Sequence, residues 1–455
     1  MEATAPLRAR GGRTISLEAT AFDEAAHFDR QRTRRADFSS ATGALQRLLQ
    51  AASTLVVMPL VLHALGAEGF GVWAAAASFA WMTTVFDFGV GQALLTRVAR
   101  AAARGEIAAI RADLGAGLLA TGGLALAAAL LAIVAIPLVA SDATRDAYLI
   151  AALCLAANAP CALGAGVWAG LQRVHVVFAW EAFQTIFTMA ALFGASLVTQ
   201  DVRWYVAATA GGLLVSNALC FAHLLLRRPD LAPAASWPDA ALCRGLLAEG
   251  GPFVALAAAA MLWVNLDTIV ALARLGADAA AQMGVAQRAC VTIYGLLWAV
   301  TQPLWPAVAE AAARGDYPWA RRSLARMGGM VLALILAGDA ILILFGPKLI
   351  DIWMGGALRL PPEVFWAMAA WALALGLGRV VDVALNGLGA VRFQARVMLI
   401  FGVTAFAMKL VAAPNAGVAG IIAASALAFL LTAAPAYVIW LSRWSGAGGA
   451  PARKS

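Results

Sequence analysis

The feature that most constrains this chain is a recurring length. About 12 apolar stretches of roughly 20 residues each follow one another, joined by short polar links. A stretch of that length crosses a bilayer as a helix, because in hydrocarbon every backbone N–H and C=O must find its partner within its own segment. Only 13% of the residues are charged and 62% are hydrophobic, unlike a soluble domain. The sequence therefore predicts an all-α polytopic membrane protein.

The expected spans fall into two sets of six. We expect an N-terminal six-helix bundle over residues 44–226, a cytoplasmic connector over residues 227–250 and a C-terminal six-helix bundle over residues 251–442. The two bundles should lie parallel to each other. The individual spans are expected near residues 44–65, 71–98, 114–140, 147–171, 177–199, 204–226, 251–272, 282–308, 327–345, 364–388, 397–413 and 416–442.

The two ends of the chain are polar. Residues 1–43 are rich in arginine and hold no apolar core followed by a small-residue cleavage site, so we do not expect a signal peptide. We expect a disordered cytoplasmic tail there, and a membrane-surface helix near residues 15–28 is the alternative. Residues 443–455 should form a second cytoplasmic tail.

The basic residues predict an orientation. With the N-terminus in the cytoplasm, twenty-five Lys and Arg residues fall on the cytoplasmic side. This bias is the positive-inside pattern of membrane proteins, so the net charge of +8 does not indicate nucleic-acid binding. We expect an even number of spans and both termini in the cytoplasm. The six basic residues assigned to the other side are Arg145, Arg203, Arg274, Lys348, Arg359 and Lys409.

Two short motifs recur at an offset of 210 positions. Residues 65–68 (LGAE) recur as residues 275–278 (LGAD), and residues 98–106 (VARAAARGE) recur as residues 308–316 (VAEAAARGD). Each motif has the same place within its half of the chain. The pattern indicates a duplication, and because each half has an even number of spans, both halves point the same way. A substrate path is expected at their interface.

Seven ionisable residues are placed well inside expected spans. A charge at the bilayer centre costs about 2.5–3.5 kcal/mol on insertion scales, so such side chains must face the bundle interior, water or one another. The five carboxylates among them are candidates for ion coupling or for the lining of a cavity. The seven are Asp87, Glu181, Asp267, Arg288, Asp339, Arg379 and Asp382.

Some of these charges could instead pair. Arg379 and Asp382 share a helix face at a spacing of three and could neutralise each other. Asp267 and Arg288 lie on consecutive spans, where they could pair or line a cavity.

Other polar residues also have two interpretations. Asp87 and Glu181 lie toward the cytoplasmic ends of their spans, where water could solvate them, and Asp339 stands alone among apolar residues. Asn265 and Asn386 could hydrogen-bond between helices or contact a substrate.

Several kinds of chemistry have no motif in this chain. It holds no GxxxxGK[ST] loop for ATP hydrolysis and no HExxH motif. The five cysteines lack the spacing of metal ligands, so we predict no metal and no cofactor. The loops expected outside the cytoplasm are short, with the longest near residues 346–363. A membrane polymerase or ligase for sugar chains would need a larger loop there, so we do not expect an enzyme.

Four motifs resemble a known family. They resemble the oligosaccharide flippases, the Wzx-type members of the multidrug/oligosaccharidyl-lipid/polysaccharide exporter superfamily, and the similarity covers most of the chain. The resemblance implies the MATE-like architecture of that superfamily. The motifs are PL at 59–60, LGAEGFGVW at 65–73, DFGVG at 87–91 and NLDT at 265–268.

The resemblance implies a function. It is the flipping of an undecaprenyl-pyrophosphate-linked oligosaccharide from the cytoplasmic to the periplasmic leaflet of a bacterial inner membrane, for O-antigen or exopolysaccharide synthesis. Because a guanidinium forks onto phosphate oxygens, we expect Arg288 and Arg379 to attract the pyrophosphate. Asn265 and Asn386 would line the cavity for the sugars. The partners would be the lipid-linked oligosaccharide, membrane lipids, and polysaccharide polymerase and chain-length machinery.

An ion gradient would drive the flippase, through carboxylates such as Asp267 and Asp339 that bind a proton or Na⁺.

Two other functions stay open. A cation-coupled multidrug or small-molecule antiporter of the same superfamily would instead use an acidic, aromatic cavity for cationic substrates. A membrane glycan polymerase or ligase is the alternative from a different class.

Overall fold

The computed structural model describes residues 11–78, 87–233, 239–301 and 304–446, and each element in these residues is a helix. The predicted all-α fold class is confirmed. The first half holds α1 (Gly11–Ser78), α3 (Val90–Arg104), α4 (Ile107–Val139), α5 (Asp142–Gly170), α6 (Val174–Val198), α7 (Val202–Arg227) and the short η2 (Pro229–Leu231). The second half holds α8 (Ala240–Ala260), η3 (Met261–Asn265), α9 (Asp267–Leu275), α10 (Ala277–Thr301), α11 (Leu304–Ala313), α12 (Tyr317–Met354), α13 (Pro362–Gly387), α14 (Val391–Leu431) and α15 (Ala433–Gly446).

The helices are built for a membrane. Eight helices among the described residues are long and apolar enough to cross a bilayer, and the bent pair Ala240–Gly251 and Phe253–Asn265, which covers α8 and η3, would make a ninth. Their outer faces carry apolar side chains: on α4, Leu126, Leu131 and Leu138 are 63%, 67% and 80% exposed. Water would not favour such a surface, whereas acyl chains cover it without cost. The chain is therefore a multi-pass membrane protein.

Two of the long helices reverse direction at breaks. α1 breaks at Gly66, whose backbone (φ 70°, ψ 176°) is essentially restricted to glycine, and α14 breaks at Ala416 and Gly417. The apolar segment Arg392–Trp444 has 53 residues, and as one straight helix it would be about 80 Å long, far longer than a bilayer requires. With these reversals, the expected passages can be followed in the described residues, apart from residues 79–86 and 302–303, which interrupt the expected spans 71–98 and 282–308.

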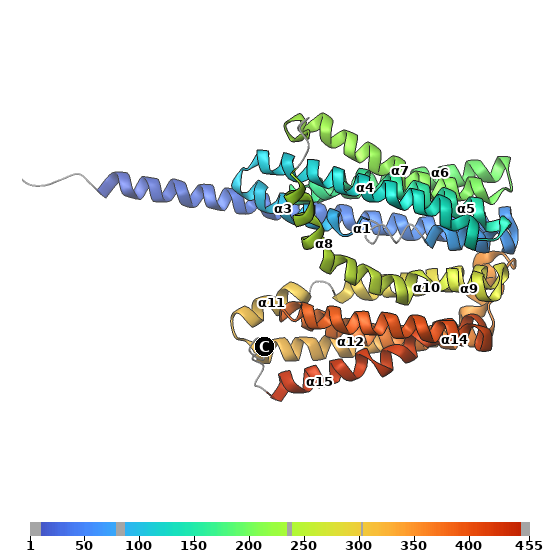
Figure 1. Ribbon diagram of the computed structural model, residues 1–455. Coiled ribbons are helices and arrows are strands. Elements are labelled where there is room, and N and C mark those ends of the chain that lie inside the picture. Colours follow the sequence, from blue (N-terminus) through green and yellow to red (C-terminus); the bar gives the residue numbers. More distant parts are fainter. Residues whose placement is uncertain (1–10, 79–86, 234–238, 302–303, 447–455) are drawn as a thin grey trace, which may run out of the picture.

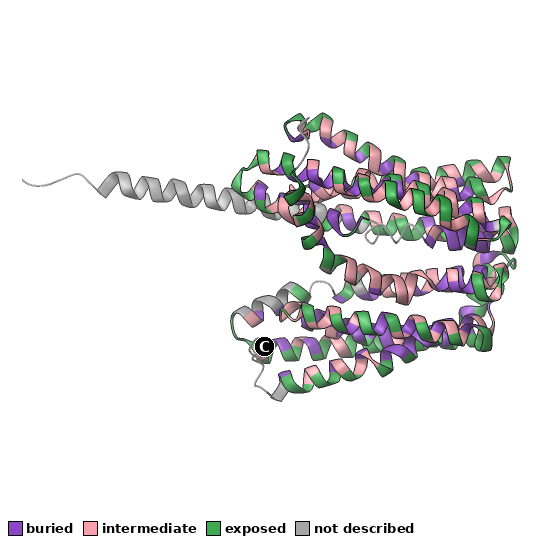
Figure 2. Ribbon diagram, viewed as in Figure 1, coloured by how far each residue is buried: buried purple, intermediate pink, exposed green. Residues whose placement is uncertain are grey.

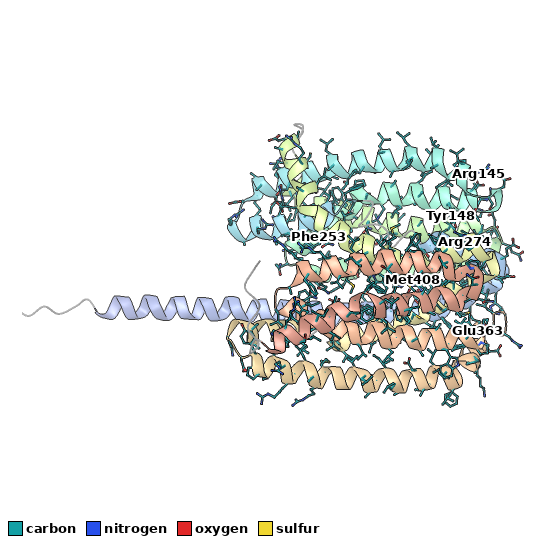
Figure 3. All side chains as sticks on the ribbon, turned by 60° about the horizontal axis from the view of Figure 1, so that its bottom comes forward. Arg145, Tyr148, Phe253, Arg274, Glu363 and Met408 are labelled. Carbon is teal, nitrogen blue, oxygen red and sulfur yellow. The ribbon has the colours of Figure 1, made fainter. Side chains whose placement is uncertain are left out.

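The two ends of the described chain lie at the same end of the molecule. In Figure 1 the start of α1 and the end of α15 both lie on the left, and in Figure 3 Arg145, Arg274 and Glu363 lie at the opposite end. An even number of passages requires this arrangement.

The helices gather in two groups. In Figure 1, α1 and α3–α7 form the upper group and α9–α15 form the lower group. Figure 2 shows that exposed residues predominate on the outer surfaces of both groups. The larger apolar core runs from Phe70 and Trp73 of α1 through α10 into α13 and α14, and so joins the two groups. A smaller core lies among α3, α4, α5 and α7 of the first group.

The two groups meet closely at the end away from the termini. Gly71 of α1 approaches α10 so closely that a Cβ at this position would lie 2.1 Å from the carbonyl oxygen of Ala277. The end of α12 also contacts α1, where Trp353 Nε1 donates to the carbonyl of Leu55 at 2.9 Å. These contacts join the groups at this end, on the right in Figure 1.

The repeated motifs have a repeated geometry. Gly276 (φ 95°, ψ −178°) adopts nearly the same backbone conformation as Gly66, its counterpart 210 positions earlier. Gly105 and Gly315 likewise match, with φ of 72° and 76°, and each is part of the same pair of capping hydrogen bonds at a helix end. The backbone therefore supports the duplication predicted from the sequence.

The ends of the first helix group differ from the expectation. α1 begins at Gly11, so residues 11–43 are helical where the sequence predicts a disordered tail. This stretch holds no proline and many Ala and Arg residues, which favour a helix. α8 begins at Ala240, inside the expected connector.

The first part of α8 is held against the first helix group. Arg97 of α3 forms ion pairs with Asp113 of α4 and with Glu249 of α8, each at 2.9 Å. A Cβ on Gly250 would lie 2.5 Å from the carbonyl oxygen of Phe88, so the backbones are in contact. α8 then bends by 43° and continues against α14. This helix therefore connects the two groups.

Candidate functional site

Two adjoining cavities lie beside the interface of the helix groups. The first has a volume of about 240 Å³ and is lined by α1, α8, η3, α9, α10 and α13. The second has a volume of about 490 Å³ and is lined by α1, α6, α7 and one residue of α10. Met58, Trp73, Ala77 and Arg288 line both cavities, so the two meet at these side chains. We call them the aromatic chamber and the polar chamber.

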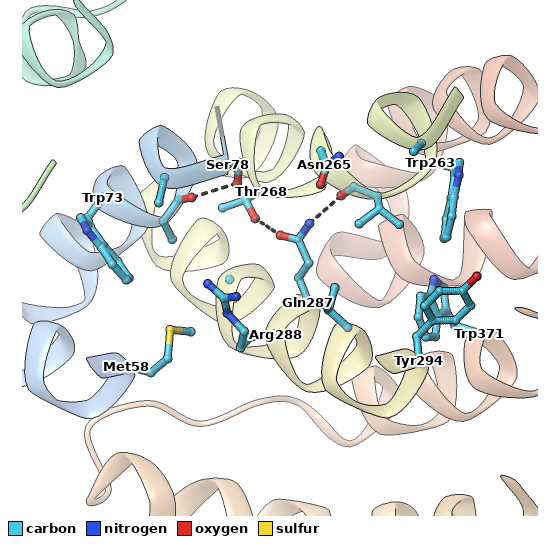
Figure 4. Close-up of a pocket in the computed structure, with 16 residues that line it drawn as sticks. Met58, Trp73, Ser78, Trp263, Asn265, Thr268, Gln287, Arg288, Tyr294 and Trp371 are labelled. Carbon is cyan, nitrogen blue, oxygen red and sulfur yellow. Dashed lines mark hydrogen bonds between the residues drawn. The ribbon is translucent and has the colours of Figure 1, made fainter. Parts of the chain in front are cut away.

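The aromatic chamber has three rings on one wall. Trp263 of η3 packs edge-on against Tyr294 of α10, with ring centroids 6.3 Å apart. Tyr294 in turn packs edge-on against Trp371 of α13 at 6.2 Å. Figure 4 shows these rings on one side of the chamber, with Trp73 and Met58 on the other. Ring faces of this kind suit apolar groups, sugar rings and organic cations.

The same chamber borders a break in a helix. The π-helical turn η3 separates α8 from α9, which frees backbone carbonyls from their usual partners. Gln287 of α10 donates Nε2–H to the carbonyl of Val264 at 2.6 Å, and its Oε1 accepts from the Thr268 hydroxyl at 2.7 Å (Figure 4). Irregular backbone is tolerated within a membrane where the protein satisfies its polar groups. Gln287 does so, and it holds η3 and α9 in place.

Arg288 is the charged group at the junction of the two chambers. Its guanidinium reaches from α10 into the space between α1 and α9 (Figure 4). Within the part of the chain that the structure describes, this guanidinium makes no hydrogen bond and no ion pair. A guanidinium stays charged and carries five N–H donors, so this side chain is available to an anionic ligand.

Half of the residues that line the polar chamber carry uncharged donors and acceptors. Two hydrogen bonds order its walls: Thr185 Oγ1 donates to Gln50 Oε1 at 3.1 Å, and Trp73 Nε1 donates to Thr209 Oγ1 at 3.0 Å. Glu181 of α6 adds a carboxylate to the lining. Such a wall suits a ligand rich in hydroxyl groups. The hydroxyl and amide side chains that line it are Gln46, Gln50, Ser53, Thr54, Gln184, Thr185, Thr188 and Thr209.

Three of the predicted site residues line these chambers. Asn265 faces the aromatic chamber, Glu181 faces the polar chamber, and Arg288 faces both. The alternative in which Asp267 pairs with Arg288 is wrong, because Asp267 pairs with Lys409 of α14. The carboxylate lies on the side of α9 that contacts α14, whereas the guanidinium lies toward α1.

Three other predicted residues lie in the second helix group and line neither chamber. Asp382 is buried and accepts hydrogen bonds from the Tyr437 hydroxyl at 2.6 Å and from Gln394 Nε2 at 2.8 Å. Arg379 is buried one turn away, within electrostatic reach of Asp382. Asn386 is half-buried near the end of α13. Asp382 therefore joins α13 to α14 and α15, and a substrate contact by Arg379 or Asn386 stays a prediction.

The last two predicted carboxylates have different surroundings. Asp87 accepts from the backbone N–H groups of Gly89 at 2.8 Å and Gly91 at 3.3 Å, so it caps the start of α3. Asp339 is half-buried on α12 and lines neither chamber. Ion coupling through either residue stays a prediction.

Lys409 is the charged residue that the sequence places wrongly. It is assigned to the outer side because it stands near the end of an expected span, but the structure buries its side chain completely within α14. Its ammonium contacts the Asp267 carboxylate and the carbonyl of Trp263. The apolar neighbours Met408 and Leu410 were the available signal, since a lysine in such a run needs a buried partner.

The sequence of the described helices matches a family model. The model of the polysaccharide biosynthesis proteins matches residues 41–312, which is more than half of the chain. The chain belongs to this family. The matched part includes every residue that lines the two chambers except Trp371. No curated protein sequence matches the chain.

Solved transporter structures have the same fold. A multidrug resistance MATE family transporter of the MOP superfamily, in an inward-facing conformation, superposes with a TM-score of 0.73 at 13% identity, covering 90% of this chain and 98% of the transporter. An outward-facing transporter of that description gives 0.54 at 13% identity, covering 88% and 96%. A MOP superfamily transporter from Pyrococcus furiosus, for which a reverse polarity of the binding pocket suggests a different function, also gives 0.54 at 13% identity, with 88% and 96% covered. These similarities confirm the MATE-like architecture.

Proposed function

We propose that the protein flips an undecaprenyl-pyrophosphate-linked oligosaccharide from the cytoplasmic to the periplasmic leaflet of a bacterial inner membrane, for O-antigen or exopolysaccharide synthesis. The family and the transporter fold support an exporter connected with polysaccharides. The observation that carries the finer proposal is the guanidinium of Arg288, which lies between the two chambers and has no partner among the residues that the structure describes. The proposal includes no catalytic step and no cofactor. Polysaccharide polymerase and chain-length machinery would use the product.

The chemistry of Arg288 suits a pyrophosphate. A planar guanidinium can make two parallel, charge-assisted hydrogen bonds to phosphate oxygens. In a cavity of low dielectric constant this attraction is stronger than in water. With the pyrophosphate at Arg288, the sugars would reach the polar chamber on one side, and the aromatic rings and Asn265 would contact the ligand on the other.

The direction of opening supports entry from the cytoplasmic leaflet. The helix groups are joined at the end away from the termini, and the basic residues predict that the termini are cytoplasmic. The TM-score is also higher with the inward-facing transporter, at 0.73, than with the outward-facing one, at 0.54. Rocking of the two groups about the chambers would then present the ligand to the other leaflet.

Glu181 is the carboxylate that best suits coupling to a proton gradient. It lines the polar chamber, whereas Asp87, Asp267 and Asp382 are engaged with other parts of the protein. A proton that binds to Glu181 would change the charge of the cavity and weaken the attraction of this carboxylate to Arg47 of α1.

A cation-coupled antiporter for drugs or small molecules is the second candidate. The ring faces of Trp263, Tyr294 and Trp371 could hold an organic cation. The fixed positive charge of Arg288 opposes this, because it would repel a cation in the same chamber. Binding assays on the purified protein separate the two: the flippase should bind undecaprenyl pyrophosphate, and the antiporter should bind tetraphenylphosphonium.

Complementation of a deletion strain tests the proposal. Loss of the gene should abolish surface polysaccharide and leave lipid-linked oligosaccharide in the cytoplasmic leaflet, and the wild type should reverse both effects. Arg288→Ala should lower the rate at least about tenfold, because a hydrogen bond to a charged group contributes about 1.5–3 kcal/mol and 1.4 kcal/mol is a factor of ten. Arg288→Lys keeps the charge but not the two parallel N–H donors. Its rate should lie between the rates of the wild type and Arg288→Ala.

The matched control is Arg274→Ala, an exposed arginine at the end of α9. It should behave as wild type. Full complementation by Arg288→Ala at an equal protein level would remove this side chain from the mechanism and, with it, the support for a pyrophosphate ligand.

A further inference from the structure

A buried ion pair lies behind the wall of the aromatic chamber. The side chains of Lys409 and Asp267 are 0% and 7% exposed, and neither lines the chamber. Charges buried to this degree are costly to desolvate, and they persist only with close partners. The surroundings of the Lys409 ammonium are therefore informative.

The ammonium contacts oxygen atoms from two segments, and a hydroxyl from a third segment shares one of these oxygen atoms. It contacts the Asp267 carboxylate of α9 and donates to the carbonyl of Trp263 at 2.6 Å. Ser425, which follows the break in α14 at Gly417, places its hydroxyl 3.4 Å from the same carbonyl. Lys409 itself comes from α14 before that break. The site is thus built from η3, the start of α9 and both parts of α14.

The carbonyl of Trp263 is available because of the π-helical turn. η3 interrupts the regular hydrogen bonding of α8, and it presents the carbonyl end of one half-helix, which carries partial negative charge. Freed carbonyls at the ends of broken helices, together with carboxylates, are the groups with which transporters coordinate Na⁺. Here a lysine ammonium lies among groups of this kind.

We infer that the Lys409 side chain fills a site for a monovalent alkali cation and acts as a built-in substitute for that ion. The carboxylate of Asp267, the carbonyl of Trp263 and the hydroxyl of Ser425 are the coordinating groups. In the wild type, Asp267 is then not available to Na⁺. Removal of the ammonium creates a site that Na⁺ occupies. The inference does not depend on which molecule is transported.

Thermal stability of the purified full chain in detergent tests this inference. Without the ammonium, Asp267 would be a buried charge with no counter-ion, and a cation that binds only the folded state stabilises it. The Tm of Lys409→Ala should therefore rise by several degrees when NaCl replaces choline chloride at constant ionic strength. The wild type and the exposed-lysine control Lys348→Ala should show no such rise. When Asp267→Asn is added to Lys409→Ala, the rise in Tm with NaCl should disappear.

A second pair of variants keeps the test decisive if Lys409→Ala does not fold. Lys409→Ser supplies a hydroxyl ligand in place of the ammonium, and Asp267→Asn with Lys409→Met replaces the ion pair by neutral groups. Folding of Lys409→Ser in NaCl but not in choline chloride would support the inference. Failure of Lys409→Ser in both salts, while the neutral pair folds in both, would overturn it. A Tm of Lys409→Ala that does not depend on Na⁺ would overturn it as well.

Discussion

At the residue scale, the charged side chains of this protein divide by whether the protein itself supplies their hydrogen-bond or ion-pair partners. Asp267 has Lys409, and Asp382 has the hydroxyl of Tyr437. These engaged groups fix one helix against another. Arg288 has no such partner among the described residues and lies at the meeting point of two cavities, so it is the group that we propose to pair with a ligand.

Replacement of Glu181 by Gln tests coupling at this scale. Glu181→Gln keeps the shape of the side chain but removes the group that takes up a proton. We expect flipping in proteoliposomes to be several-fold faster with a pH gradient than without one for the wild type, and to be equal under both conditions for the variant. Gln184→Asn, which alters the same wall without a titratable group, should keep the dependence on the gradient. A gradient effect of normal size in Glu181→Gln would exclude this residue from coupling.

At the scale of the element, breaks in helices create the functional geometry. The turn η3 frees carbonyls that Gln287 and Lys409 then bind. The reversal at Gly66 turns α1 back through the membrane so that Met58 and Trp73, on opposite sides of the break, line the same chambers. A regular helix would separate these side chains, because it advances about 1.5 Å per residue.

The glycine reversals should be sensitive to any added side chain. At Gly66 and Gly276, φ is positive and ψ is near 180°, a conformation that costs other residues about 1–3 kcal/mol. Gly66→Ala and Gly276→Ala should each lower the Tm by several degrees in detergent. Gly211→Ala is the control, because Gly211 lies within α7 with open space around it, and there alanine should leave the Tm unchanged or raise it. An unchanged Tm in Gly66→Ala would show that the reversal tolerates a Cβ.

At the scale of the whole molecule, two duplicated helix groups are joined at one end and share cavities at their interface. The contact between Gly71 and Ala277 belongs to the joined end, and the chambers are lined from both groups. Because a packed interface has discrete arrangements rather than a continuous range, a change at this contact should shift the balance between two states.

Gly71→Val should disfavour the arrangement in which α1 contacts α10 at Ala277. Its Cβ would lie 2.1 Å from the carbonyl oxygen of Ala277, so the contact must open. A cysteine at position 53 in the polar chamber, in a chain without other cysteines, should then react several-fold faster with a membrane-impermeant maleimide added from outside the cell. Gly211→Val, with no atom near the added side chain, is the matched control. Equal labelling rates in all three backgrounds would contradict the role of this contact.

The amino-acid sequence by itself determined the fold class, the reversals after residues 65 and 275, the family and three of the chamber residues. The physical reason is that an apolar segment long enough to cross a bilayer must form a helix there. The order of apolar and polar residues therefore suffices to predict the spanning helices. The helix face that carries Gln46, Gln50 and Ser53 also follows helical spacing, but the sequence does not show that it faces a cavity.

Only the tertiary structure decided which charges meet. Asp267 and Lys409 are 142 positions apart. Asp267 pairs with this lysine rather than with Arg288, which is nearer in sequence, because α9 packs against α14 through the face that carries the carboxylate. Pairing depends on how the faces of distant helices are turned toward one another. Hydropathy shows that a buried charge needs a partner, but helix packing determines which residue that partner is. Here the packing places Lys409 beside Asp267, and Arg288 faces the cavity.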